Sequence, residues 1–522
     1  MCQSISLLAI LCFQIASSAQ WNTDLNSNLV LSATARIENV LYDGNGYYLT
    51  WQEGSGPFSH QVVRLNLDGT YNWPMAMLAH DHDLGSSTLN LQHSAVDNDH
   101  NFIRVSSYIN DNGEFCCINK IDTTGTQLLN GATGIEFSGL AMGFALGQSG
   151  NMYVLVNSDL KKVDANGNVL WTTTLDPDHL NSRAGRIIES ANGSVGVAYF
   201  VPGGGNPAYG RYYIARFDAA GNRTTVGSVL ISPALCSFYR PYFFTANAAG
   251  DYYFVCFDTN TSVSFVQHII GDAPQISGNG IALDNAANSS FITGVVIGNT
   301  LCAFYQYDWN SFDEGGMKLQ VIDMANGSLA YDQGVNLFNA ADGVRPMQHS
   351  AVDLNGIPAC LIVENPSNVV RLLEYGNAGM NSYPLFTSSS TKGLGATSTF
   401  NTINSGGEKQ VVAFIEDYRN GTDYPAAVAQ NLILDSIISV EHLTQSSINV
   451  YPNPTDQSTH LAIDESLLGA QCTIMDATGK MIQSFPMQRI KYEINTAGWP
   501  AGIYHVILQK KSVRMSRTLV LD

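Results

Sequence analysis

Charged residues are scarce in this chain, and basic ones are scarcer still. Asp, Glu, Lys and Arg make up 13% of the 522 residues, against about a quarter in an average soluble protein. There are 25 Lys and Arg against 44 Asp and Glu, which gives a formal net charge of −19. Phosphate backbones and anionic lipids repel an acidic surface, so the composition argues against nucleic acid and anionic membranes as partners.

Long hydrophobic runs are also missing. No stretch approaches the roughly 18 apolar residues of a membrane span, so we expect no membrane-spanning segment. The apolar run from Leu7 to Ala16 leads into Ser17-Ser18-Ala19, which predicts a signal peptide over residues 1–19. No Lys or Arg precedes this run, unlike in most signal peptides, and a buried N-terminal helix is the alternative.

Sequence signatures of catalysis, cofactors and metals are absent too. The chain has no G-x-S-x-G, H-E-x-x-H, phosphate-binding loop, EF-hand loop or C-x-x-C motif. The cysteines of the body lie mostly inside apolar runs, which favours buried free thiols over the disulfides that export permits. We therefore predict no cofactor and no metal. Two weak hints stay open: calcium at turns such as Asp164–Asn168, and a metal at His80-Asp81-His82-Asp83.

What the chain does contain is an internal repeat. The segment Gln92-His93-Ser94-Ala95-Val96-Asp97 recurs 256 residues later as Gln348-His349-Ser350-Ala351-Val352-Asp353, and weaker copies lie between them. Each unit of about 50 residues has two turns rich in Asp, Asn and Gly, and each turn predicts a hairpin. Two hairpins give four antiparallel strands per unit, which is the pattern of a β-propeller blade.

Eight such units can be counted. The strand after the first turn is expected to begin near Tyr47, Phe102, Met152, Val195, Tyr252, Leu301, Ile357 and Val411. We predict an all-β protein with an eight-bladed propeller over residues 20–435, or a seven-bladed one if the weak unit at 280–335 is misread. Residues 29–35 are expected to pair with a strand near residues 426–434, which closes the ring and removes an exposed sheet edge.

The segment from Asp164 to Trp171, D-x-x-G-x-x-x-W, resembles the repeat of quinoprotein-type propellers. The resemblance implies the fold only. Trp stands at this place in few units and no quinone-binding residues accompany it, so we expect no quinone cofactor.

Arginines recur at one place in the repeat. Arg36, Arg183 and Arg240 each lie ten residues before the glycine of their first turn, and Arg345 lies eleven before Gly356. That position is the start of the innermost strand, where converging guanidinium groups suit carboxylate or sulfate groups. The alternative is that each Arg pairs with an acidic residue of a neighbouring blade. With the histidines of the recurring motif, the candidate ligand-binding residues are Arg36, Arg183, Arg240, Arg345, His93 and His349.

The C-terminal residues 448–522 differ from the repeat. They open on Tyr451-Pro452-Asn453-Pro454 and contain Asp476-Ala477-Thr478-Gly479-Lys480 and Pro500-Ala501-Gly502-Ile503-Tyr504. These motifs resemble the C-terminal sorting domain of the type IX secretion system. The resemblance implies a small β-sandwich that the outer-membrane translocon recognises, with residues 436–447 as the linker where cleavage occurs. The motif residues are Tyr451, Pro452, Asn453, Pro454, Gly479, Lys480, Gly502 and Tyr504.

The resemblance to a sorting domain implies a secreted or surface protein, exported first to the periplasm and then across the outer membrane. The sequence favours a non-catalytic binding or adhesion protein for an extracellular glycan or protein. A polysaccharide-degrading hydrolase or lyase that uses the propeller funnel, and a structural surface component, are the alternatives.

Overall fold

The structure is a computed structural model in which the chain divides into two units, Met1–Leu432 and Ile433–Asp522. The predicted signal peptide and linker lie outside the residues it describes. Those residues are 29–32, 35–53, 59–73, 77–78, 93–129, 134–176, 183–203, 206–225, 227, 229–237, 242–247, 249–271, 273–276, 278–284, 288–311, 314–364, 369–376, 379–387, 394–403, 409–417, 426–433, 449–451, 453–455, 457–463, 467–476, 480–510 and 513–521.

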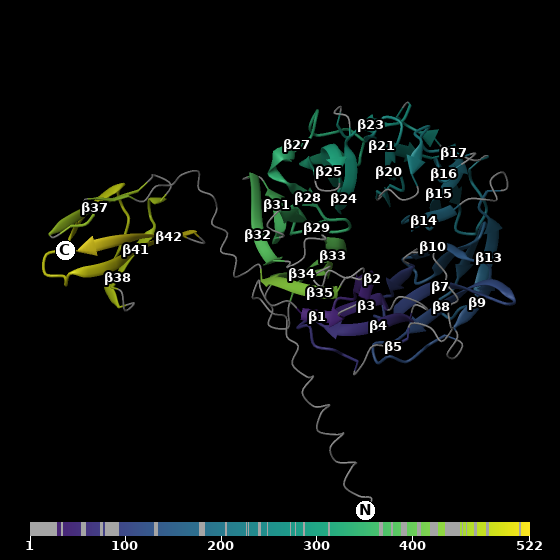
Figure 1. Cartoon of the computed structure of the whole chain (residues 1–522), viewed down its shortest axis with the longest axis horizontal. Helices are drawn as coiled ribbons and strands as arrows, with labels where there is room; N and C mark the ends of the chain where they lie inside the picture. Colours follow the sequence, from purple (N-terminus) through teal and green to yellow (C-terminus); the bar gives the residue numbers. More distant parts are fainter. Residues whose placement is uncertain are drawn as a thin grey trace, which may run out of the picture. The chain divides into compact units, whose positions relative to one another are not determined.

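The first unit is built from antiparallel sheets whose strands follow chain order. Figure 1 shows the sheets in a ring; in the sheets of four consecutive strands, the first strand lies toward the inner side and the last toward the outer side. Four sheets have four consecutive strands each: β2 (Ala35–Tyr42), β3 (Gly46–Glu53), β4 (Ser59–Asn66) and β5 (Met77–Leu78); β6 (Ser94–Val96), β7 (Phe102–Asn110), β8 (Gly113–Ile121) and β9 (Ile135–Ser138); β10 (Ala141–Leu146), β11 (Met152–Val156), β12 (Asp159–Val163) and β13 (Val169–Thr174); β24 (Ser290–Ile297), β25 (Thr300–Ser311), β26 (Glu314–Asp323) and β27 (Val335–Phe338).

Two further sheets are larger. The ten-stranded sheet contains β14 (Arg183–Glu189), β15 (Val195–Gly203), β16 (Asn206–Phe217), β17 (Val229–Leu230), β18 (Cys236–Ser237), β19 (Phe243–Ala246), β20 (Tyr252–Asp258), β21 (Val263–Ile270), β22 (Ala273–Pro274) and β23 (Ile281–Ala282). The five-stranded sheet contains β28 (Val344–Pro346), β29 (Val352–Asp353), β30 (Pro358–Glu364), β31 (Val369–Gly376) and β32 (Gly379–Thr387). A short 3-10 turn, η2 (Ala340–Asp342), precedes β28.

The two ends of the first unit meet in one sheet. This sheet contains β33 (Leu394–Ile403), β34 (Lys409–Asp417), β35 (Ala426–Ile433) and the N-terminal strand β1 (Leu29–Ser32). Strand β1 pairs antiparallel with β35, with Leu29 opposite Ala429. The predicted closure is therefore confirmed, and it covers an edge of β35 that would otherwise be open to another strand.

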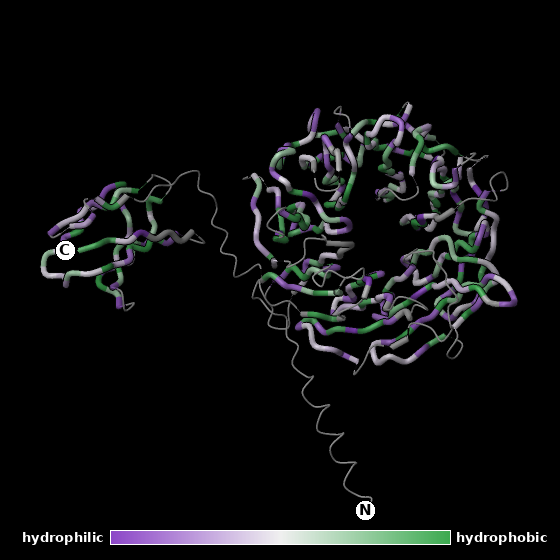
Figure 2. The backbone as a smooth tube through the Cα atoms, viewed as in Figure 1, coloured by the Kyte–Doolittle hydropathy of each residue, from purple (hydrophilic) through white to green (hydrophobic). Residues whose placement is uncertain are grey.

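Apolar side chains fill the spaces between neighbouring sheets of the ring. The second strand of a sheet is buried on both faces, as in β11 and β20, where every residue is buried. Figure 2 shows the apolar stretches that recur along the strands of the ring. Tyr47 and Leu49 share one cluster with Val412 and Phe414 of the last sheet. Each second strand thus packs against both neighbouring sheets, which explains its aromatic and β-branched sequence.

The turns follow the prediction closely. All eight strands expected after a first turn are present and begin within two residues of the predicted positions, at residues 46, 102, 152, 195, 252, 300, 358 and 409. The turns before β11, β15 and β20 have a glycine with φ near +80° at their fourth position (Gly150, Gly193 and Gly250). Glycine adopts this conformation without the steric cost that other residues carry.

The second unit has two sheets that share a core. One contains β36 (Asn449–Tyr451), β37 (Ser458–Ala462) and β40 (Lys491–Asn495), and the other contains β38 (Gln471–Asp476), β39 (Met481–Pro486), β41 (Gly502–Lys510) and β42 (Val513–Leu521). Leu461 and Ile494 of the first sheet pack in one cluster with Ile474, Val506 and Leu519 of the second. The expected small β-sandwich of about seven strands is therefore present.

The described cysteines are free thiols, and all are buried, as predicted: Cys116, Cys117, Cys236, Cys256, Cys302, Cys360 and Cys472. In the described part of the chain, no helix has the length and apolarity of a membrane span.

Candidate functional site

Three of the four recurring arginines lie at or near the beginning of the first strand of a sheet. Arg36 is exposed near the start of β2, Arg183 is the first residue of β14, and Arg345 is half-buried in β28. The side chain of Arg183 and the whole of Arg240 fall outside the described residues. A contact between an arginine and an acidic residue of a neighbouring sheet occurs at Arg104, which is not one of the four recurring arginines. Arg104 Nη2 of β7 lies 3.0 Å from Glu38 Oε2 of β2.

The two histidines of the recurring motif lie near a fifth arginine, Arg186. His93 precedes β6, His349 lies between β28 and β29, and Arg186 is in β14. Burial is the main cause that lowers the pKa of both imidazoles, and the positive charge of Arg186 lowers it further, although the two histidines lie 256 residues apart in sequence. Arg186 therefore interacts electrostatically with both histidines.

Strand β10 links His93 to Arg186. The imidazole of His93 is hydrogen-bonded to the backbone of Ala141, the first residue of β10. Two residues further on, a Cβ added to Gly143 would lie 2.4 Å from the carbonyl oxygen of Gly185. Glycines at both positions allow β10 and β14 to approach closely, and Arg186 follows directly in β14.

His93 is held in its neutral form. Burial is the main cause that lowers its pKa, to about 4; the hydrogen bond to Ala141 opposes this, and Arg186 lowers the pKa further. The Nε2 atom of His93 is buried and has no hydrogen-bond partner among the described residues. A buried nitrogen without a partner is costly, and a ligand group could satisfy it.

Tyr242 is in contact with Arg186. The guanidinium carbon of Arg186 lies 5.2 Å from the centre of the Tyr242 ring, a cation–π contact. Burial raises the pKa of the Tyr242 hydroxyl, and the charge of Arg186 and a hydrogen bond from it oppose this shift. We call His93, Arg186, Tyr242 and His349 the inner-strand cluster. It offers one exposed guanidinium, a phenol and two imidazoles, of which the guanidinium and the phenol are donors suited to a carboxylate or sulfate group.

Sequence reasoning found the two histidines of the inner-strand cluster and missed the other two members. The spacing rule selected Arg183 and passed over Arg186, three residues later on the same strand. The pairing register of β14 shifts between Arg183 and Gly185, so the side chain that faces a given direction cannot be counted from the turn. The aromatic residue Tyr242 carries no spacing signal of its own.

The described residues contain no group of three or more His, Cys, Asp or Glu side chains placed to hold a metal ion. The segment His80-Asp81-His82-Asp83 lies outside them. The Asx-rich turn at Asp164 is satisfied internally, because Asp164 Oδ1 accepts hydrogen bonds from the backbone of Asn166 and Asn168.

The motif residues of the C-terminal unit stabilise its fold. Asn453 donates from Nδ2 to the Thr518 carbonyl at 2.8 Å and accepts at Oδ1 from the Val520 amide at 2.8 Å. The Lys480 amide donates to Asp476 Oδ1 at 3.0 Å and closes the turn between β38 and β39. Tyr504 is buried, and its hydroxyl donates to the Pro500 carbonyl at 2.7 Å. Tyr451 is exposed in β36, Gly502 begins β41, and Pro452 and Gly479 lie outside the described residues.

Residues 449–522 match the family model of the secretion system C-terminal sorting domain. The C-terminal unit is a type IX sorting domain. The sorting domain directs the protein across the outer membrane, to the cell surface or into the medium, and implies that the secretion machinery handles the chain. The sequence resemblance is therefore confirmed for this part of the chain.

The comparison with curated proteins finds no match. Among solved structures, the chain is similar to the β-propeller domain of the Trilobed protease from Pyrococcus furiosus, at 8% identity and a TM-score of 0.39, over 67% of this chain and 97% of that one. It is also similar to the Pan2 WD40 domain of Neurospora crassa, at 11% identity and a TM-score of 0.33, over 65% of this chain and 88% of that one. These likenesses carry no argument about function; the strand order and ring closure of the chain itself establish a propeller-like body.

Proposed function

We propose that the protein is an exported eight-bladed β-propeller that binds a ligand without catalysis, and that the inner-strand cluster receives the carboxylate or sulfate groups of an extracellular acidic glycan. The observation that carries the proposal is the exposed Arg186 guanidinium, which lies over the Tyr242 ring and close enough to His93 and His349, from two other sheets, for its charge to lower the pKa of both.

The count of eight blades rests on how the ten-stranded sheet divides. Strand β18 joins its halves through few residues, with Gly210 opposite Cys236 on one side and Cys236 opposite Asp258 on the other. On either side of it, β14 to β17 and β19 to β23 each have the order of a single blade. The weak unit at 280–335 coincides with the complete sheet of β24 to β27. Seven sheets, one of them double, support eight blades.

The proposed maturation follows from the two ends of the chain. We expect removal of residues 1–19 on export to the periplasm, a propeller over residues 20–435, and cleavage in the linker 436–447 before the sorting domain. Seven basic and seven acidic residues lie in 436–522, so the net charge of −19 belongs to the propeller. An acidic ligand must therefore be recognised by a local positive group rather than by the overall field, which is the role that we assign to Arg186.

An array of acidic and neutral oligosaccharides, probed with the exported protein, tests this function. We expect binding to uronic-acid or sulfated glycans and weaker binding to their neutral counterparts. Galacturonic acid oligomers and their methyl esters make a matched pair, because esterification removes the charge of the carboxyl groups and leaves the sugar rings unchanged. Equal binding to the acids and the esters, or no binding to any acidic glycan, would contradict the proposal.

One alternative function has a specific observation in its favour. The neutral His93 and the Tyr242 hydroxyl beside Arg186 include the base, acid and carboxylate-neutralising groups that a lyase for uronic acid polymers requires. Incubation of the exported protein with polygalacturonate and alginate distinguishes the two functions. Unsaturated products that absorb ultraviolet light would show that the inner-strand cluster cleaves its ligand and does not only bind it.

A further inference from the structure

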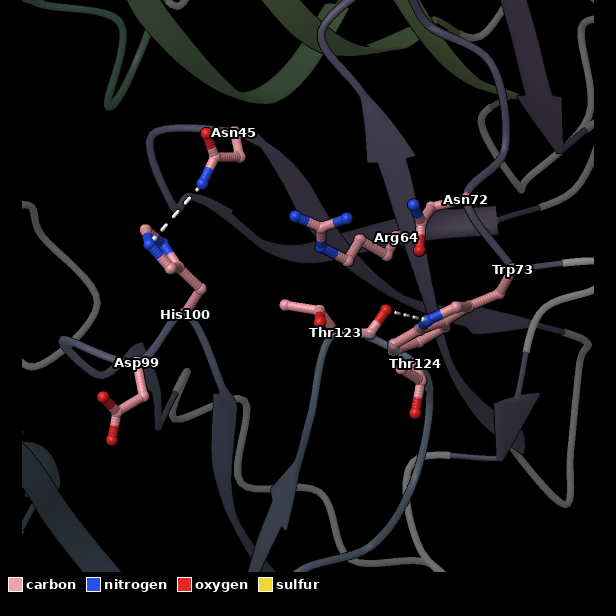
Figure 3. A pocket seen from close by; sticks show the side chains of 8 residues that line it. All are labelled: Asn45, Arg64, Asn72, Trp73, Asp99, His100, Thr123 and Thr124. Carbon is pink, nitrogen blue, oxygen red and sulfur yellow. Dashed lines mark hydrogen bonds between the residues drawn. The ribbon is translucent and has the colours of Figure 1, made fainter.

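A polar recess lies on the turns between the first two sheets of the ring. We call the boundary between the sheet of β2–β5 and the sheet of β6–β9 the first junction. The recess has a volume of about 640 Å³. Its walls carry the amides of Asn45 and Asn72, the hydroxyls of Thr123 and Thr124, the His100 imidazole and the Trp73 indole (Figure 3). The volume falls within the range of small-molecule sites.

The turn conformations and the tryptophan contact that form the recess recur elsewhere in the chain. At the first junction the Trp73 indole donates to the Thr123 carbonyl of the next sheet at 3.0 Å. At the boundary between β10–β13 and β14–β17, which we call the third junction, the Trp171 indole donates to the Ala219 carbonyl at 3.3 Å. Thr123 follows Asp122, and Ala219 follows Asp218, in the same kind of turn. The tryptophan contact therefore joins sheets and does not by itself indicate a ligand.

The side chains around this shared backbone differ between the two junctions. Thr123 and Thr124 of the first junction stand where the third junction has Ala219 and Ala220. His100 stands where the third junction has Gly193, at the fourth position of a five-residue turn. The third junction shows that alanine and glycine suffice to build the turns. The Thr124 hydroxyl donates to Asp122 Oδ1 at 2.7 Å within its own turn, so His100 and Thr123 are the polar residues that require another explanation.

His100 has an unfavourable conformation for its position. Its φ is +65°, in the left-handed region, where the equivalent residues Gly150, Gly193 and Gly250 have φ of +78°, +79° and +86°. A side chain in this region is strained, and such strain is concentrated at functional sites. The imidazole at this position points toward the Asn45 side chain beside the recess (Figure 3).

The contacts of His100 determine which nitrogen is available. Nδ1 lies 2.6 Å from the Asp43 carbonyl, an acceptor, so Nδ1 carries the proton. In neutral His100 the Nε2 atom is then an acceptor, and Asn45 Nδ2 lies 3.5 Å from it. This distance is too long for a good hydrogen bond, which leaves Nε2 able to accept from a ligand hydroxyl.

The charges around the recess argue against an anionic ligand. The one guanidinium in the wall, Arg64, is buried and paired with Asp43 Oδ2 at 2.7 Å. The carboxylate of Asp99 also lines the recess and is exposed. The remaining wall groups are neutral and include both donors and acceptors. This combination suits hydroxyl groups, which donate and accept at once.

We propose that the recess at the first junction binds one or two residues of a neutral carbohydrate, with His100 Nε2 as an acceptor and the Thr123 hydroxyl as a donor or acceptor to sugar hydroxyls. This site is separate from the inner-strand cluster and does not rest on the function proposed for it.

Saturation-transfer NMR with the methyl glycosides of glucose, galactose, mannose and N-acetylglucosamine tests the site in the exported protein. We expect transfer to at least one glycoside at ~10 mM, a concentration that detects affinities in the millimolar range. The double variant His100→Gly/Thr123→Ala installs the residues of the third junction. It should lower the transfer at least ~5-fold, because two hydrogen-bonding groups are lost, and should leave binding of acidic oligosaccharides unchanged. A control variant, Asn166→Ala, changes an exposed residue of an equivalent turn and should leave the transfer unchanged.

The same variants separate a binding role of His100 from a structural one. The double variant should unfold within ~2 °C of the wild-type temperature, because relief of the strained φ offsets the lost Nδ1 contact. A large drop in the unfolding temperature would show that His100 joins the sheets, and would overturn the assignment. Absence of transfer to all four glycosides in the wild type, or undiminished transfer in both the double variant and Thr123→Ala alone, would also overturn it.

Discussion

The inner-strand cluster and the recess at the first junction are two polar sites on one ring, built in different ways. The recess uses turns of neighbouring sheets and a backbone that recurs at the third junction. The cluster uses side chains from sheets that are far apart in sequence and has at its centre an arginine, Arg186, that lies outside the predicted spacing. Arg186 and His100 both depart from the repeat, whereas the recurring tryptophan contact joins the sheets; the two proposals therefore rest on departures from the repeat as much as on the recurring histidines.

The largest expected effect concerns the buried ion pair between Arg64 and Asp43 in the wall of the recess. Asp43→Ala removes the partner of the buried Arg64 guanidinium and should lower the free energy of unfolding by about 3 kcal/mol, because an uncompensated charge stays buried. Urea unfolding of the ring measures this loss. Glu364→Ala breaks the partly exposed pair with Arg371, whose contact is 2.7 Å, and is the control, with an expected loss below about 1 kcal/mol. Equal losses for the two variants would show that the recess has no buried charge to satisfy.

The second effect tests the cluster through pH. The pKa of folded His93 is lowered to about 4, below the value of about 6.5 in an unfolded chain. The unfolded state therefore takes up the proton first, so this stabilisation is complete above about pH 6.5 and is lost as the pH falls toward 4. The loss should reach at most about 3 kcal/mol.

Comparison of wild type with His93→Gln between pH 7 and pH 4 isolates this contribution, because the pKa of His268 and of His349 is also lowered and they titrate in both proteins. The difference in stability between the two proteins should shrink as the pH falls. A difference that is independent of pH would mean that His93 is not held neutral.

A smaller loss of stability is expected when the Tyr48 hydroxyl, which joins the first two sheets beside the recess, is removed. The Tyr48 hydroxyl donates to the His100 carbonyl at 2.9 Å, so Tyr48→Phe should cost about 1 kcal/mol. Tyr153→Phe is the matched variant at the third junction, where the hydroxyl donates to Glu189 Oε1 at 2.6 Å. Thermal unfolding should show losses in both variants, because each bond joins neighbouring sheets. Loss in only one of them would mean that the junctions are not equivalent.

The smallest expected effect on stability belongs to Arg186. Its side chain is exposed and makes a cation–π contact with Tyr242, so Arg186→Ala should lower the free energy of unfolding by only about 0.5 kcal/mol. Urea unfolding checks this value. A larger loss would indicate that Arg186 joins sheets, as Arg104 does through Glu38, and would remove the reason to regard it as free to bind.

Much of the fold could be predicted from the sequence because turn chemistry is local. Asp, Asn and Gly at fixed offsets determine where hairpins form, and the strands after Asp43-Gly44 or Asn247 through Gly250 begin where the pattern indicates. The closing strand β1 was predictable as well, since an unpaired edge needs a partner. The sorting domain was recognisable because its motifs stabilise its own turns, as Asn453 and Tyr504 do.

The sites were less predictable because they depend on which way a side chain faces. A shift in register within β14 separates Arg183 from Arg186, and no spacing rule reports such a shift. The importance of His100 depends on its φ of +65° in a turn where the sister residues are glycine. That substitution is visible in the sequence once the turns are aligned, but the alignment requires the pairing of Val96 with Phe102.

The central claim is that Arg186 and the two neighbouring histidines recognise an acidic ligand. Isothermal titration of the exported protein with trigalacturonic acid tests it most directly, in wild type, Arg186→Ala and Arg36→Ala. The account predicts that Arg186→Ala weakens binding about tenfold or more, because a charge-assisted contact is lost, while the exposed Arg36→Ala binds as the wild type does. Equal weakening in both variants, or undiminished binding in Arg186→Ala, would contradict the claim.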